Sequence, residues 1–413
     1  MPRIPPELCA RCKGYKKLCG LPTCPILDRF RSQIHAANKI RDSVIEGESP
    51  PSILVGERGY PRVRVYYLIP PGYRGEEARY HEAPVEWTLR REPLQGIIRL
   101  RSELVSAYKR VEVNDPWKLY EDEISISAIS ERPVDSEAHL ARPPSPRLSF
   151  NGLTKPLGPS APVMKLRISS NPAIPRVIER AIWDDAKTTT SLIDLYTRGI
   201  DVYTLQKMLS AGLLGRIRRR RVVPTRWAIT AVDDTISKYL RERIRDFKEA
   251  SDVKVYYSEY LGNRFLIILM PGHGSVEWIE AWHPFTVWTR GARRVLYWRI
   301  YEDPLGRANG MDGGFSAARI SVLEHLARSR VKGDVVIIRE ILPSYYAPVG
   351  NWHIRESVKR ALSLPPIAVN PTLQELQSII ESKTSLRMNQ LSNYVTLIGL
   401  GKKRISRITE FIE

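Results

Sequence analysis

The chain has 413 residues, 43% of them hydrophobic, which is enough for a sizeable buried core and for more than one domain. The longest unbroken apolar run, Phe265 to Met270, is too short to span a membrane, and the polar N-terminus lacks the apolar stretch of a signal peptide, so we expect a soluble cytoplasmic protein. A formal charge of +19 favours a polyanionic partner, nucleic acid first, although a generally charge-rich surface is the alternative.

All four cysteines lie within the first 24 residues, in a Cys-x2-Cys-x6-Cys-x4-Cys pattern, at Cys9, Cys12, Cys19 and Cys24. Four thiolates at tetrahedral corners suit Zn²⁺, and four protein ligands leave no open position for a substrate. An iron–sulfur cluster and a pair of disulfides are the alternatives, and a reducing cytosol disfavours the second. The sequence therefore predicts a zinc finger with structural Zn²⁺ over residues 1–30.

The first half of the chain mixes helix and strand patterns. Apolar spacing predicts a helix from Ile26 to Ile45, alternation over residues 49–73 predicts two strands, and a basic helix is expected from about Leu94 to Val113. Residues 131–163 contain seven prolines and are expected to form a long extended or loop segment. Lys155 near its end is a candidate phosphate contact.

A run of six arginines within eleven residues follows two predicted helices that each end near a glycine. This arginine run consists of Arg216, Arg218, Arg219, Arg220, Arg221 and Arg226. Guanidinium groups match phosphate geometry, and the adjacent Trp227 can stack on a base. The run is a candidate nucleic-acid site, with a solvated turn between helices as the alternative. An amphipathic helix is expected next, with Asp234 as its N-cap.

Four consecutive strand patterns between residues 253 and 303 predict an antiparallel sheet, followed by a helix, a strand and another helix. Because runs of helices and runs of strands are segregated along the chain, we expect an α+β fold with a large mixed domain.

Two glycines begin the helix predicted after this sheet. Gly313 and Gly314 would let a ligand approach the free N–H groups of the first turn, where Ser316 and Arg319 also lie. Phosphate binding at this helix start is one interpretation. Close packing against a neighbouring helix is the other.

Two pairs of carboxylates are candidates for catalysis: Asp233 with Asp234, and Glu277 with Glu280. Neighbouring carboxylates can hold Mg²⁺ or Mn²⁺ for phosphodiester cleavage. Equally, the aspartates are good residues for a helix start and the glutamates can pair with arginines.

The chain closes with "GKKRISRITEFIE". In a single 3₁₀ turn, positions three apart eclipse, so Ile408 and Phe411 would form one apolar surface beside Ile412. Such a terminal segment either docks on another protein or packs back on its own domain.

Several of these motifs together resemble the archaeal Nre family of DNA repair proteins, NreA type. The resemblance is carried by the cysteine cluster and by "PPSILVGERGYPRVRV", "SERPVDSE", "LTKPLGPSAP", "VVPTRWAITAVDD", "NRFLIILMPG", "EWIEAWHP", "GGFSAARISVLEHL" and "PVGNWHIRES". It implies a role in the DNA damage response and binding to the sliding clamp PCNA through a C-terminal peptide. It also implies an N-terminal region over residues 31–290, a C-terminal region over 291–395 and a clamp-interacting tail over 396–413.

In that tail, Ile405 stands where the family's clamp peptide usually has Gln. Ile408 and Phe411 match its aliphatic and first aromatic positions, and Ile412 replaces the second aromatic residue. The sequence thus predicts a zinc-containing repair protein that binds DNA through the arginine run and PCNA through its tail. The alternatives are a metal-dependent nuclease or phosphodiesterase and an RNA-associated protein.

Overall fold

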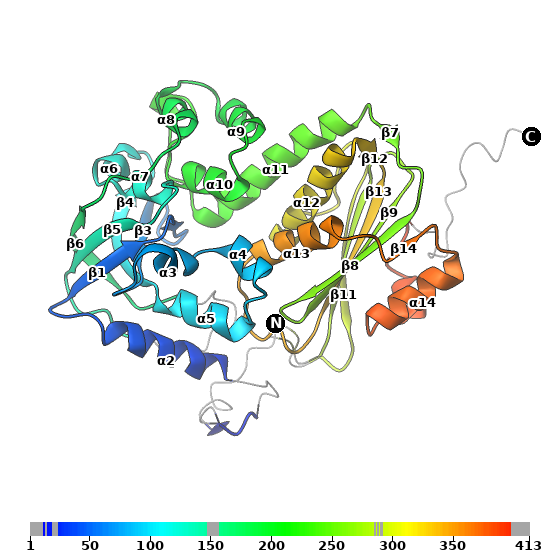
Figure 1. The fold of residues 1–413 in the computed structure, drawn as a ribbon, viewed down its shortest axis with the longest axis horizontal. Coiled ribbons are helices and arrows are strands. Elements are labelled where there is room, and N and C mark those ends of the chain that lie inside the picture. The colour runs from blue at the N-terminus through cyan, green and yellow to red at the C-terminus, as the bar shows by residue number, and fades with distance from the viewer. Residues whose placement is uncertain are drawn as a thin grey trace, which may run out of the picture. The chain divides into compact units, whose positions relative to one another are not determined.

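The computed structural model describes residues 11–12, 15–18, 24–146, 157–284, 286, 289 and 292–397. The chain divides into two compact units. The first unit comprises Arg3–Ile236 with Ala347–Gly350, and the second comprises Ser237–Tyr346 and Asn351–Glu413 together with Met1–Pro2. Each unit combines helices with its own six-stranded sheet, which confirms the predicted α+β class (Figure 1). In the described part of the chain, no helix is long and apolar enough to cross a membrane.

The sheet of the first unit has the order β1-β5-β6-β4-β3-β2 and is antiparallel except for the pair β4 and β6. Its strands are β1 (Val44–Ser49), β2 (Leu54–Val55), β3 (Arg62–Ile69), β4 (Val105–Glu112), β5 (Val134–Leu140) and β6 (Ser160–Ile168). Side chains of β5 alternate between buried and half-buried along the strand, as in a sheet with one face on the core. Part of the proline-rich segment therefore forms strands, because β5 pairs with both β1 and β6.

Nine α-helices lie wholly within the described residues of the first unit. They are α2 (Pro25–Ala37), α3 (Gly75–Tyr80), α4 (Pro84–Leu89), α5 (Leu94–Glu103), α6 (Trp117–Glu121), α7 (Ile124–Ala128), α8 (Arg176–Trp183), α9 (Thr188–Thr197) and α10 (Val202–Ser210).

Two predicted helices extend too far. Helix α2 ends at Ala37, before β1, and α5 ends at Glu103, where Leu104 turns into extended backbone. The following residues of β4 pair with β3 and β6, and this pairing overrides the helical pattern.

Helix α11 (Thr225–Ile244) begins earlier than the sequence pattern predicted. Asp234 therefore lies inside the helix and is not its N-cap. The division between the two units falls within this helix, between Ile236 and Ser237.

The sheet of the second unit has the order β11-β10-β13-β9-β8-β14. The strands are β8 (Lys254–Tyr260), β9 (Asn263–Met270), β10 (Val276–Trp282), β11 (Leu296–Glu302), β13 (Asp334–Ile341) and β14 (Ala368–Val369), and a separate pair consists of β7 (Lys248–Glu249) and β12 (Val331–Lys332). Four consecutive antiparallel strands were expected, but β13 lies between β9 and β10 and runs parallel to β10. Strand insertion of this kind needs long-range pairing, which no local pattern reveals.

Both faces of this second sheet are covered (Figure 1). Helices α12 (Gly313–Ser329) and α13 (Trp352–Ser363) pack together, and α13 contacts β8 and β9. Helices α14 (Leu373–Lys383) and α15 (Met388–Leu391) complete a core with residues of β8, β9, β10 and β13. A sheet covered on both faces explains the unbroken apolar run of β9.

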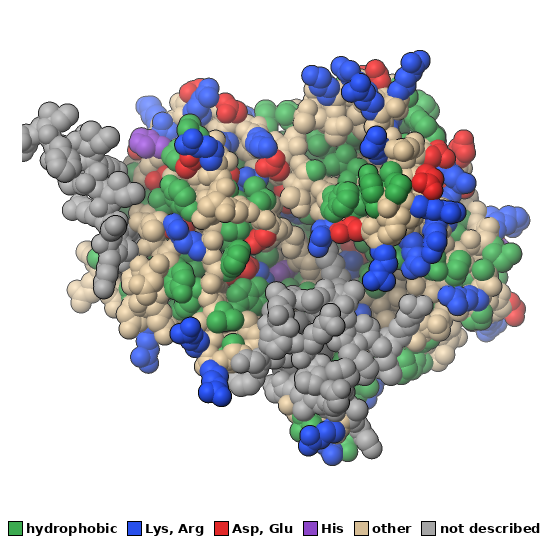
Figure 2. Space-filling model, turned by 180° about the vertical axis from the view of Figure 1, so that it is seen from behind, with side chains coloured by type: hydrophobic (Ala, Val, Ile, Leu, Met, Phe, Trp, Pro, Cys, Tyr) green, Lys and Arg blue, Asp and Glu red, His purple; other side chains and the backbone are tan. Residues whose placement is uncertain are grey.

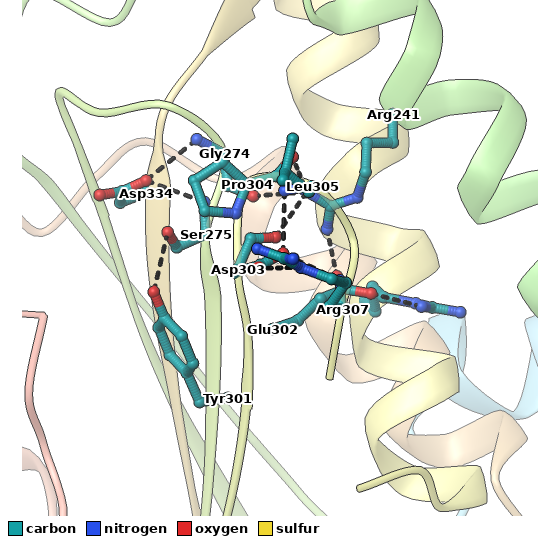
Figure 3. A network of polar contacts seen from close by, with 11 residues as sticks. Arg241, Gly274, Ser275, Tyr301, Glu302, Asp303, Pro304, Leu305, Arg307 and Asp334 are labelled. Atoms are coloured by element: carbon teal, nitrogen blue, oxygen red, sulfur yellow. Dashed lines mark hydrogen bonds and ion pairs between the residues drawn. The ribbon is translucent and has the colours of Figure 1, made fainter. Parts of the chain in front are cut away.

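A buried carboxylate links β11 to two helices of the second unit (Figure 3). Glu302 is fully buried and contacts Arg241 of α11, while its Oε1 accepts a hydrogen bond of 2.6 Å from Nη1 of Arg319 on α12. Arg241 Nη1 also donates to the backbone oxygen of Gly274, at 2.7 Å. These arginines are held inside the fold by paired charge.

Candidate nucleic-acid interface

The arginine run leaves α10 through two tight turns. Gly212 and Gly215 adopt φ values of +74° and +103°, which glycine adopts without strain. A β-carbon at Gly215 would lie 2.6 Å from Oγ1 of Thr188, so this position also needs the absence of a side chain. The chain then forms a 3₁₀ turn at Ile217–Arg219, whose first N–H donates to Oδ1 of Asp185 at 2.7 Å.

Arg220 is the one arginine of the run that is buried. Its guanidinium donates to three backbone oxygens: Gly215 at 2.8 Å, Ile182 at 2.5 Å and Asp184 at 2.8 Å. Burial lowers the pKa of Arg220 from its ordinary value, and the nearby Asp185 and Asp184 oppose that shift. Arg220 therefore fastens the run to the end of α8 through three of its five N–H donors.

The other arginines of the run point into solvent. Arg216, Arg218, Arg219 and Arg221, here called the exposed arginines, form no ion pair with any residue that the structure describes. Arg226 is also exposed but pairs with Glu57, at 2.7 Å between Nε and Oε1. Four cationic side chains without a described carboxylate partner therefore lie in a segment that Arg220 anchors to the end of α8. Figure 2 shows one face of the molecule, on which Lys and Arg side chains (blue) lie beside hydrophobic ones (green).

Aromatic side chains lie on the same unit. Trp183, the last residue of α8, is 57% exposed and stacks on Trp117, with ring centroids 5.8 Å apart and an interplanar angle of 18°. Tyr120 meets Trp183 edge-on at 5.6 Å, and the guanidinium of Arg220 lies 5.6 Å from the centre of the Trp117 ring. No local pattern in the sequence marks this cluster, because its members come from α6, α8 and the arginine run.

Trp227 forms a second aromatic pair. The residue is 45% exposed, and its ring lies 5.5 Å from that of Tyr60, a residue that is 47% exposed. Trp227, which the sequence predicts to stack on a base, thus has an aromatic neighbour from the β2–β3 connection.

The helix start at Gly313 is closely packed. A β-carbon on Gly313 would lie 2.0 Å from Nδ2 of Asn351, and Asp312 accepts the N–H of Phe315 at 2.7 Å as N-cap. Ser316 is buried and donates to the backbone oxygen of Asp312 at 2.8 Å, and Arg319 binds Glu302. These contacts agree with the packing interpretation at Gly313, and phosphate binding at this position stays a prediction.

The four candidate carboxylates have different surroundings. Asp233 is buried in the first unit and accepts a hydrogen bond of 3.0 Å from Gln206, while Asp234 is half-buried. Glu277 and Glu280 are three residues apart on β10 and so point to opposite faces of the sheet. Among the described residues, no group of three or more His, Cys, Asp or Glu side chains is placed to hold a metal ion.

Each glutamate of β10 has its own polar partners. Glu277 accepts hydrogen bonds from Arg299 at 2.7 Å and from the backbone N–H groups of Thr396 and Leu397, both at 3.1 Å. Glu280 accepts one of 2.6 Å from Arg339. Burial raises the pKa of Glu280, and Arg339 opposes this effect.

Arg339 links several buried groups of the second unit. It also donates to Oδ1 of Asn263 at 2.9 Å and contacts Nε2 of His353 at 3.1 Å. The environment of Glu280 is therefore that of a buried ion-pair network.

A cleft of about 640 Å³ in the first unit was not anticipated from the sequence. At its base Glu103 accepts a hydrogen bond from Tyr73 at 3.1 Å and contacts Nε2 of His81 at 3.3 Å, while Nδ1 of His81 lies 2.8 Å from the backbone oxygen of Glu77. Burial alone would raise the pKa of Glu103, but its contacts with His81 and Tyr73 together outweigh burial and lower the pKa. The three side chains come from separate elements, so no spacing in the sequence marks them.

Several candidate residues lie outside the described residues: Cys9, Cys19, Lys155, Ile405, Ile408, Phe411 and Ile412. Of the other two cysteines, Cys12 is buried and Cys24 is half-buried.

Comparison with known families gives two matches that together cover most of the chain. Residues 18–289 match the family described as archaeal Nre, N-terminal, and residues 302–411 match archaeal Nre, C-terminal. No solved structure matches the chain.

Three curated relatives are similar over nearly their whole length. DNA repair protein NreB of Archaeoglobus fulgidus is 32% identical over 96% of this chain and 98% of its own. DNA repair protein NreA of the same organism is 34% identical over 87% of this chain and 89% of its own length. DNA repair protein NreA of Haloferax volcanii is 34% identical over 84% of this chain and 83% of its own length. These matches confirm the resemblance that the motifs predicted: the chain belongs to the archaeal Nre family.

Proposed function

We propose that this chain is a DNA repair protein that binds DNA through the exposed arginines. The printed names of the relatives support the repair role. The observation that carries DNA binding is the presence of four solvent-facing guanidinium groups without a carboxylate partner among the described residues. Cations that no carboxylate neutralises are available to phosphates, and their planar donor groups match phosphate oxygens.

Salt dependence tests this proposal. Each phosphate that a protein neutralises releases condensed counterions, so the logarithm of the binding constant falls with the logarithm of salt concentration by about 0.9 per contact on duplex DNA. Fluorescence anisotropy of a labelled duplex across a salt series measures that slope. We expect the double variant Arg218→Ala/Arg219→Ala to reduce its magnitude by about 2.

A matched control removes the same charge elsewhere. Arg293 and Arg294 are adjacent and exposed on the second unit. The double variant Arg293→Ala/Arg294→Ala should leave the slope close to that of the unmodified protein. Equal losses in the two double variants would contradict a specific role of the exposed arginines and leave only the effect of net charge.

We also propose that Cys9, Cys12, Cys19 and Cys24 hold a structural Zn²⁺. The support is the chemistry of the donor set, because four thiolates are soft ligands that suit tetrahedral zinc. Elemental analysis of the purified protein should find one zinc ion per chain, and Cys12→Ser should lower that content. Iron in place of zinc, or no metal, would contradict the assignment.

Recruitment to PCNA is proposed for the C-terminal tail. Ile408 and Phe411 carry the pattern of an apolar docking peptide. Phe411→Ala should abolish co-elution with PCNA in size-exclusion chromatography, whereas Glu410→Ala, next to it, should not. Co-elution of the Phe411→Ala variant would remove this side chain as the anchor.

The enzymatic alternative stays a prediction with a direct test. Incubation with nucleotides and with nicked or single-stranded DNA, with Mg²⁺ or Mn²⁺ added, would have to give a product that Asp233→Ala or Glu277→Ala loses. Product formation that both variants retain would exclude these carboxylates as its source.

A further inference from the structure

Trp183 lies at the surface of the first unit. The residue is 57% exposed, although its ring stacks on Trp117 and meets the ring of Tyr120 edge-on. Two aromatic neighbours hold the indole in one orientation. A rigid ring with a supported back and an accessible front is the arrangement that proteins use to stack bases.

Arg220 joins this ring to the arginine run. Its guanidinium binds the backbone oxygens of Ile182 and Asp184, the residues on either side of Trp183, and also the oxygen of Gly215 immediately before the run. The N–H of Ile217 adds a further bond to Asp185. Trp183 and the exposed arginines are therefore fixed with respect to each other by four hydrogen bonds.

A hollow of about 440 Å³ adjoins the ring of Trp183. Its other lining residues are Arg176, Glu179, Arg180 and Asp184. This lining offers both hydrogen-bond donors and acceptors, as the edge of a base does, whereas a phosphate presents only acceptors. The hollow thus fits a base better than a phosphate. The phosphates of the same strand would contact the exposed arginines instead.

We propose that Trp183 stacks an unpaired base of a DNA strand whose phosphates contact the exposed arginines. This inference rests on the proposed DNA binding and specifies its substrate as single-stranded DNA or a duplex with an unpaired segment. In an intact duplex each base is already stacked between its neighbours and offers no face to an indole. A protruding aromatic platform therefore distinguishes unpaired strands from duplex, while arginines bind both.

The test compares two DNA forms and two tryptophans. Anisotropy at one salt concentration measures affinity for a labelled single strand and for a duplex of the same length. Trp183→Ala should weaken single-strand binding by about tenfold and change duplex binding less than twofold, because one stacked base is lost. Trp183→Phe should recover most of the loss. Trp298, which is 58% exposed on β11, gives the matched control Trp298→Ala, for which both affinities should stay unchanged.

The outcomes separate this inference from the function on which it rests. If Arg218→Ala/Arg219→Ala weakens both DNA forms but Trp183→Ala changes neither, DNA binding stands and the stacking site is wrong. If the arginine variant changes neither form, the proposed DNA binding itself fails. Tighter binding of a single-stranded RNA of the same sequence would overturn the choice of DNA.

A second measurement covers the case in which Trp183→Ala does not fold. A single strand carrying 5-bromodeoxyuridine is irradiated with the unmodified protein, and the cross-linked peptide is identified by mass spectrometry. We expect the cross-link on the peptide that contains Trp183. A cross-link confined to peptides of the second unit would overturn the proposal.

Discussion

The buried arginines of the second unit and the exposed arginines of the first unit differ in their partners. In the second unit, the buried Arg319 and the half-buried Arg241 both pair with Glu302, and Arg339 is buried against Glu280 (Figure 3 shows Arg241 and its partners). In the first unit, the exposed arginines stand in water without a carboxylate partner among the described residues. The contrast teaches that a count of arginines says little about function until each one is assigned a partner. Paired arginines hold the fold, and unpaired ones remain available to an anion.

Arg220 shows that both uses occur within one run of sequence. Its neighbours Arg219 and Arg221 are exposed, whereas it is 4% exposed and binds three backbone oxygens. The buried member positions the exposed ones. Four substitutions test this division between structural and available arginines.

Removal of the buried carboxylate that pairs with Arg241 and Arg319 should have the largest effect. Glu302→Ala leaves the buried Arg319 and the half-buried Arg241 without their shared counter-charge, which costs about 3–5 kcal/mol of unfolding free energy. Urea denaturation followed by circular dichroism measures the loss. The control is Glu242→Ala, which breaks the solvent-exposed pair with Arg245, 3.0 Å long, and should cost less than about 1 kcal/mol. Similar losses in the two variants would refute the distinction between buried and exposed pairs.

Arg220→Ala should come second. It removes two buried hydrogen bonds and one part-buried hydrogen bond to backbone oxygens, and we expect a loss of about 2–4 kcal/mol in the free energy of unfolding. DNA affinity should fall as well, because the exposed arginines and Trp183 lose their common anchor. A stable variant with unchanged affinity would show that Arg220 does not position the run.

Glu340 gives a pH-dependent effect of intermediate size. This buried carboxylate accepts hydrogen bonds from Arg264 at 3.1 Å and from the N–H of Ser385 at 2.9 Å, and its Oε1 lies 2.7 Å from Nε2 of His283. Burial would raise the pKa of Glu340, but these contacts outweigh it and lower the pKa from 4.5. Its contribution to stability is therefore complete above pH 4.5 and lost as the pH falls through the lower folded value.

Glu340→Gln tests that sign. The variant should be less stable than the unmodified protein by about 1–3 kcal/mol at pH 7. Thermal or urea unfolding between pH 7 and pH 3 should show this difference shrinking as the pH falls. A difference that grows toward acid would mean that the pKa of Glu340 is raised in the folded protein.

Arg219→Ala should have the smallest effect on stability. The side chain is exposed and pairs with no described carboxylate, so the free energy of unfolding should change by less than about 0.5 kcal/mol. Affinity for DNA should nevertheless fall, measured by anisotropy on the same preparation. A stability loss comparable with that of Arg220→Ala would place Arg219 among the structural arginines.

The sequence by itself determined the kind of structure that most segments adopt. Helices α9 and α10 are the two helices predicted before the arginine run, and the helix predicted to begin at Gly313 does so. Strands β8, β9, β10 and β11 follow the predicted strand segments. These features depend on neighbours within a few residues, and local pattern carries that information. The motifs also identified the family.

Tertiary structure decided strand neighbours, charge partners and the aromatic cluster. Strand β13 enters between β9 and β10, and β4 forms where a helix was expected, because pairing with distant strands overrides local preference. The local sequence does not distinguish the six arginines of the run from one another. Long-range contacts bury Arg220 and leave its neighbours in solvent. Trp117 and Trp183 meet for the same reason. The exposure of a side chain and the identity of its partners are properties of the folded chain, because they depend on residues far apart in sequence.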